Sequence, residues 1–73
     1  MDRYELRIAG ELGKRRRHDL GCEPGGTAPA GQSRLVTEPL DRSALYGLLT
    51  RMRDAGNDLI AVQRINPHDE GDT

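Results

Sequence analysis

The sequence predicts an α+β fold, in which a small antiparallel sheet of three or four strands carries one main helix on one face. Three segments support this prediction: an alternating stretch near the start, an amphipathic stretch in the second half, and an apolar run directly after it. Apolar residues recur every two positions in a half-buried strand and every 3.6 in a helix, so spacing separates the two. We expect one domain over residues 1–65, followed by an acidic, disordered tail over residues 66–73.

The first strand is expected at the start of the chain. Its apolar positions are Tyr4, Leu6 and Ile8, and the positions between them are Glu5, Arg7 and Ala9. This alternation is typical of a strand with one apolar face and one mostly polar face. Leu12 continues the same parity, so the strand is predicted to run to about that residue.

A basic run follows the first strand, and we expect it to form a solvated turn or a short helix. The run consists of Lys14, Arg15, Arg16 and Arg17. Clustered cations can bind a polyanion by releasing its condensed counterions, so polyanion binding is the alternative. No aromatic residue is interleaved with the run and the sequence pI is about 6.1, which favours the solvated turn.

Shorter elements are expected between the basic run and the main helix. Asp19 to Glu23 form a plausible second strand, and Arg34 to Thr37 a third. The Pro/Gly-rich residues between them, about 23–33, are predicted to be a flexible loop.

His18 and Cys22 could form a nucleophilic pair or half of a zinc site. The sequence does not indicate a third group that would orient a nucleophilic pair, or the further ligands that a zinc ion needs. We therefore predict no catalytic residue, no cofactor and no metal site.

The main helix is expected from about Asp41 to Gly56. Four apolar residues occupy its i, i+3, i+4 and i+7 positions: Leu45, Leu48, Leu49 and Met52. Asp41 is suited to be the N-cap, with Ser43 as the alternative. Gly56 can adopt the left-handed conformation that ends a helix.

The fourth strand is expected at Leu59 to Ile65. Its first four residues are all apolar, which predicts cover on both faces of this strand.

Gly47 lies inside the main helix, on the side opposite its apolar face. It is either a tolerated surface glycine or a flat position where a partner backbone can approach closely.

The predicted core is small, because the chain has 73 residues, two tyrosines, and no Phe or Trp. Small domains are often supplemented by disulfides, metals or oligomerisation. A single cysteine cannot form an internal disulfide, so oligomerisation is the expected supplement. Candidate interface residues are Tyr46, Gly47, Ile60 and Val62.

The predicted element order matches a reduced form of the split βαβ, ferredoxin-like arrangement, β-(α)-β-β-α-β, with the first and third strands in the centre. Without the first helix, the same order gives a β-β-β-α-β open sandwich. The first strand and residues 35–65 resemble short uncharacterised proteins of high-GC, actinomycete-type bacteria with the pattern D-x-x-A-L-x-G-L-L-x-R-L-R-D-x-G. The resemblance supports the fold and implies no activity.

We therefore expect a small, non-enzymatic protein-interaction module that self-associates or serves as an accessory subunit. One alternative is a nucleic-acid-associated protein that uses Lys14 to Arg17. The other is a small-ligand binder or enzyme on the open sheet face, with Tyr4, Glu5, Arg7, His18 and Cys22 as its candidate residues. No apolar run has the length of a signal peptide or a membrane span, so we expect a cytoplasmic protein with no membrane partner.

Overall fold

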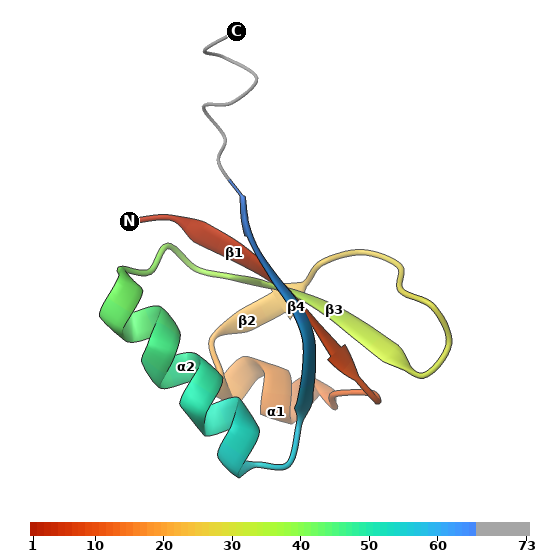
Figure 1. Cartoon of the computed structure of the whole chain (residues 1–73). Helices are drawn as coiled ribbons and strands as arrows, with labels where there is room; N and C mark the ends of the chain where they lie inside the picture. Colours follow the sequence, from red (N-terminus) through yellow and green to blue (C-terminus); the bar gives the residue numbers. More distant parts are fainter. Residues whose placement is uncertain (66–73) are drawn as a thin grey trace, which may run out of the picture.

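The structure is a computed structural model, and it describes residues 1–65. Its elements are β1 (Arg3–Ala9), α1 (Lys14–Asp19), β2 (Cys22–Pro24), β3 (Gln32–Thr37), α2 (Arg42–Asp54) and β4 (Asp58–Ile65). The predicted α+β fold is confirmed, with four strands and one main helix (Figure 1). The basic run forms the short helix α1, so the open-sandwich alternative without a first helix was wrong. The predicted tail, residues 66–73, lies outside the described residues.

The four strands form one sheet in the order β2-β3-β1-β4, and every neighbouring pair is antiparallel. β1 and β3 are the central strands, as predicted. Leu6 of β1 lies opposite Leu35 of β3 and, on its other side, opposite Val62 of β4. Both helices lie on the same side of this sheet (Figure 1).

The core lies between the sheet and α2. It consists of Leu6, Ile8, Cys22, Leu35, Leu48 and Met52. The alternation in β1 produces this arrangement, because Leu6 and Ile8 are fully buried while Glu5 and Arg7 point to the other face of the sheet. The apolar face of α2 behaves as its spacing predicts, with Leu45 also buried.

Both ends of α2 are closed by the residues that the sequence indicated. The N-cap is Asp41, whose Oδ1 accepts a hydrogen bond of 2.7 Å from the Ala44 amide, and Ser43 lies inside the helix. At the other end Gly56 has a φ of +86°, which favours glycine. The Asn57 amide donates to the Met52 carbonyl at 3.0 Å, which completes a Schellman-type end.

The first strand is shorter than predicted. β1 ends at Ala9, because Gly10 has a φ of +87° and turns the chain. Ser33 holds this turn: its hydroxyl donates to the Gly10 carbonyl at 2.8 Å and accepts from the Leu12 amide at 3.2 Å. Leu12 still packs against the core, but it does so from the loop.

The second strand and its loop are shifted relative to the prediction. α1 extends to Asp19, so β2 begins only at Cys22 and ends at Pro24. β3 begins two residues before Arg34, at Gln32. The connection is therefore residues 25–31, which is shorter than the predicted loop of about 23–33.

The prediction that β4 is covered on both faces was wrong. β4 is an edge strand, and each of its residues is exposed except the half-buried Ile65. Leu59 is 43% exposed, Ile60 46% and Val62 38%. A β-bulge also leaves Ile60 without a partner residue in β1. The apolar run of β4 is thus buried neither by α2 nor by a second strand within the described residues.

No helix within residues 1–65 is long and apolar enough to cross a membrane.

Candidate functional site

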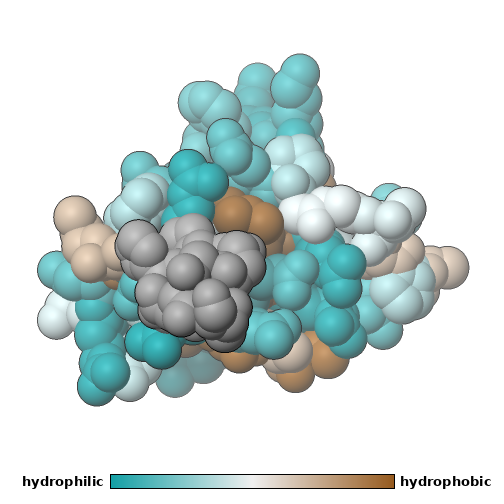
Figure 2. Space-filling view, turned by 90° about the horizontal axis from the view of Figure 1, so that it is seen from above, coloured by the Kyte–Doolittle hydropathy of each residue, from teal (hydrophilic) through white to brown (hydrophobic). Residues whose placement is uncertain are grey.

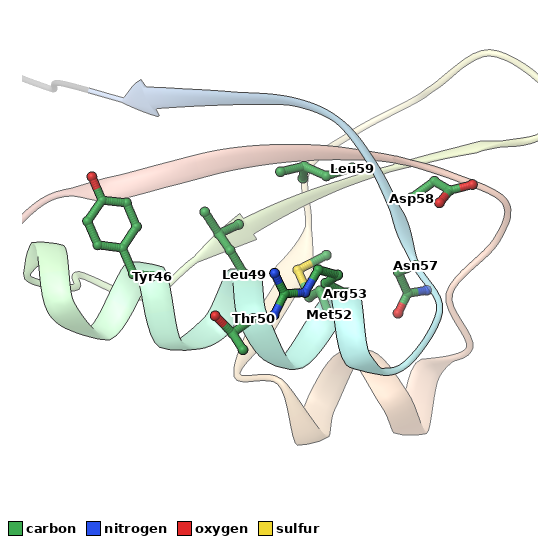
Figure 3. Close-up of a pocket in the computed structure, with 8 residues that line it drawn as sticks. All are labelled: Tyr46, Leu49, Thr50, Met52, Arg53, Asn57, Asp58 and Leu59. Carbon is green, nitrogen blue, oxygen red and sulfur yellow. The ribbon is translucent and has the colours of Figure 1, made fainter.

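A groove of about 730 Å³ lies between α2 and the first half of β4 (Figure 3). Its lining is mainly apolar: Tyr46, Leu49 and Met52 come from α2, and Leu59 comes from β4. Asn57 and Asp58 lie at the end of the groove where α2 connects to β4, and Thr50 and Arg53 add polar groups from α2 (Figure 3). The combination of an apolar floor and a polar rim is typical of recognition surfaces.

The groove follows from the helical positions of its residues. Leu45, Leu48 and Met52 face the core, whereas Tyr46 and Leu49 occupy the flank of α2 that is turned towards β4. Met52 is only 1% exposed and so forms the floor, while Tyr46 is 59% exposed at the rim. The buried residues of α2 share a core with residues of the central strands β1 and β3, whereas every residue of β4 except Ile65 is exposed.

Exposed apolar residues gather around this groove. We call Tyr46, Leu59, Ile60 and Val62 the apolar strip. Within residues 1–65, these four and Met1 are the large hydrophobic residues that are exposed. Isolated exposed apolar side chains are ordinary on a protein surface, whereas these four are grouped on two elements that follow one another in the chain.

Three of the four predicted interface residues belong to the strip, and the fourth does not. Tyr46 lines the groove from α2, and Ile60 and Val62 are exposed residues of β4 that follow the groove residue Leu59. Gly47 instead lines a second groove, of about 490 Å³, on the other flank of the helix together with Gly21 and Glu38. A Cβ atom at Gly47 would meet nothing within 4 Å, so this position is sterically open. Leu59, which is exposed on β4 and lines the groove, was not among the predicted interface residues.

The basic run does not form a single cationic face. Lys14 to Arg17 are consecutive residues of the six-residue helix α1, and successive helical residues point about 100° apart. Their charges are therefore distributed around the helix. Lys14, Arg15 and Arg16 are exposed, and Arg17 is half-buried.

The residues predicted for a ligand site on the open sheet face are not together. Tyr4 and Cys22 pack into the core on the opposite face, and His18 is exposed on α1. Glu5 and Arg7 do lie on the open face, which is mostly hydrophilic in the view from above (Figure 2). The expectation of one site formed by these five residues was wrong, because neighbouring residues of a strand face opposite sides.

Charges on the open face are partly paired. Nε of Arg34 lies 2.9 Å from Oε2 of Glu5, an ion pair whose angles are not those of a hydrogen bond. Arg7 lies directly opposite Arg34, and Nε of Arg7 is buried without a hydrogen-bond partner. Like charges directly opposite one another destabilise a sheet, and the Glu5 carboxylate offsets part of this repulsion.

Cys22 is a buried thiol without catalytic surroundings. Its Sγ lies 3.8 Å from the Leu20 carbonyl oxygen. Burial, and secondarily the negative charge of Glu38, raise the pKa of the Cys22 thiol. The nucleophilic form of cysteine is the thiolate, so a raised pKa makes this residue less reactive at neutral pH. In residues 1–65, no group of three or more His, Cys, Asp and Glu side chains could hold a metal ion.

Alkylation of Cys22 should therefore report unfolding. At pH 8 we expect iodoacetamide to label the native protein at least about tenfold more slowly than the urea-unfolded chain, because both burial and the raised pKa protect the thiol. The measurement is the labelled fraction against time by intact mass. Equal rates in the two states would show that the thiol is accessible and ionised in the folded protein.

The family model DUF8691, described as a domain of unknown function, matches residues 3–63. The chain belongs to this family. The DUF8691 match runs from the first residue of β1 to Gln63 of β4, so it includes both sides of the groove and all of the apolar strip. No curated protein and no solved structure matches the chain. The family description names no function, so the function is inferred from the geometry of the groove and the apolar strip.

Proposed function

We propose that this member of DUF8691 is a small, non-enzymatic protein-interaction module that binds a protein through the groove and the apolar strip. The observation that carries the proposal is the distribution of exposed apolar residues. Tyr46, Leu59, Ile60 and Val62 lie on α2 and β4, the two elements that border the groove, and three of them are consecutive or nearly so on one edge strand. Such a grouping costs solubility unless a partner covers it.

Burial of these side chains supplies a driving force for binding. Moving a fully exposed Leu, Ile or Val out of water contributes about 1.5–3 kcal/mol, and these residues are about half exposed, so each can contribute roughly half of that. Tyr46 adds a large side chain with few rotatable bonds, of the kind that often anchors an interface. The rim residues Arg53, Asn57 and Asp58 offer hydrogen bonds around this apolar centre.

The architecture supports a scaffold role for the rest of the chain. The strand order β2-β3-β1-β4 supports assignment to a reduced ferredoxin-like arrangement, in which α1 has only six residues. A rigid sheet then holds β4 beside α2, and the groove between them is formed in the unbound protein. A preformed site lowers the entropic cost of binding.

Site-specific photocrosslinking tests the proposal. p-Benzoylphenylalanine in place of Tyr46 should form a defined protein adduct when cells of the native host are irradiated, because this side chain lies at the rim of the groove. The same residue in place of Ala30, which is exposed in the 25–31 loop, is the control. Mass spectrometry of the adduct identifies the partner, whether it is a second copy of the chain or a different protein.

Two further results decide the outcome. A Val62→Lys substitution in the same chain should reduce the position-46 adduct at least about fivefold, because it places a charge in the strip. The proposal is wrong if positions 46 and 30 give the same adducts, or if position 46 gives none.

A further inference from the structure

The two edges of the sheet are very different. β2 forms one edge, and it is three residues long and ends in Pro24, which has no amide hydrogen to donate. β4 forms the other edge, and it has eight residues and no proline. Proteins usually protect edge strands by shortness, proline or charge. The β2 edge has two of these features, whereas the central part of β4 has none of them.

The unprotected edge is also the apolar one. The middle of β4 is the uncharged sequence Leu59-Ile60-Ala61-Val62, and all four residues are exposed. β1 satisfies the backbone groups on one side of β4, so those on the other side face outwards. A strand with free backbone groups and apolar side chains is a template for another strand.

The charges of β4 indicate which strand fits. An acidic residue, Asp58, begins the strand, and a basic residue, Arg64, lies near its end. If two copies pair antiparallel with Ala61 opposite Ala61, Asp58 of each copy lies next to Arg64 of the partner subunit. Parallel pairing in register would instead bring like charges together. β4 is therefore complementary to itself in the orientation that a two-fold axis requires.

We propose that the partner of the apolar strip is a second copy of this chain, joined by antiparallel pairing of the two β4 edges into one eight-stranded sheet. The inference rests on the proposed function, because it uses the same strip. In the register centred on Ala61, Ile60 of each copy lies opposite Val62 of the partner subunit, so two apolar pairs flank the two-fold axis. Both α2 helices lie on the same face of the joined sheet.

Two features of β4 work against this pairing. The bulge at Ile60 bends the strand, which can discourage a neighbour. Arg64 also has an internal contact, with Nη1 3.8 Å from Oδ2 of Asp2. Arg64 is exposed and Asp2 is half-buried, so this contact is weak and does not prevent Arg64 from pairing with a second copy.

Sedimentation equilibrium from low micromolar to millimolar concentration tests the second-copy inference. The wild type should approach twice its monomer mass of 8.1 kDa. Val62→Lys should weaken association at least about thirtyfold, because it brings two lysines close to the two-fold axis and removes two apolar contacts. Ala30→Lys carries the same added charge in an exposed loop and should associate as the wild type does.

A charge exchange tests the antiparallel orientation. Asp58→Arg should weaken the dimer about fivefold, because it places an arginine next to Arg64 of the partner subunit. Adding Arg64→Asp to the same chain should restore the affinity to within about twofold of wild type, since the exchanged charges are again opposite. Melting curves at low concentration verify that every variant is folded.

The outcomes separate this inference from the proposed function. A wild type that remains monomeric at millimolar concentration overturns the second-copy inference, and the position-46 adduct then shows whether a different protein occupies the strip. A dimer that Val62→Lys does not weaken, or that the double exchange does not restore, overturns β4 pairing.

Discussion

Leu6→Ala is expected to remove about half of the stability of this protein. Leu6 is fully buried on the central strand β1, and its neighbours across the sheet are Leu35 and Val62. Replacing a buried leucine by alanine costs about 2–5 kcal/mol, because the transfer free energy is lost and a cavity remains. A domain of this size has a total stability of roughly 4–10 kcal/mol, from about 0.05–0.15 kcal/mol per residue. The variant should therefore lose about half of its free energy of unfolding.

Urea denaturation followed by circular dichroism measures this loss. The matched control is Leu59→Ala, the same substitution at a position that is 43% exposed. At low micromolar concentration, where self-association is minimal, we expect this control to cost less than about 1 kcal/mol. Similar losses for the two variants would mean that Leu59 is as well packed as Leu6, which contradicts the exposed position of β4.

Thr37→Val is expected to destabilise the protein by about 1–3 kcal/mol, although valine has nearly the same shape and is more apolar. Thr37 is buried, and its hydroxyl accepts a hydrogen bond of 3.1 Å from the Tyr4 amide. The same hydroxyl donates to the Glu38 carbonyl at 2.7 Å. Valine leaves both backbone groups without this partner, and the cost of an unpaired buried polar group is of this size.

Thr37→Ser is the control for the hydroxyl. Serine retains both hydrogen bonds and removes one methyl group, so we expect it to be more stable than the valine variant in the same urea titration. If the side chain of Thr37 contributed only packing and strand propensity, valine would equal or exceed the wild type, and serine would be the least stable of the three. That order would contradict the hydrogen-bonding role.

Local signals predicted α2 and the apolar face of β1 well. The cap at Asp41 and the left-handed Gly56 involve groups within one or two turns of each other, and so does the apolar spacing. For β1, two-residue alternation was enough to separate the buried Leu6 and Ile8 from the outward-facing Glu5 and Arg7.

Features that depend on distant residues were not predicted. The end of β1 depends on Ser33, whose hydroxyl holds the turn at Gly10 from 23 residues further along the chain. The role of Thr37 depends on Tyr4, which is 33 residues away in sequence. Neither pairing has a local pattern, because each arises only when β1 and β3 are in register.

By itself, the sequence determined the kinds of elements, their order and the faces that α2 and β1 bury, because periodicity and capping act between near neighbours. Only the tertiary structure decided that β4 is an edge strand. The apolar run Leu59 to Val62 is equally suited to a covered strand, and its exposure follows from its place at the edge of the sheet, because the buried residues of α2 share a core with β1 and β3. The same packing places Tyr46 and Leu59 in the lining of one groove and Gly47 in the lining of another, on the opposite flank of the helix, so the candidate site is a consequence of sheet topology.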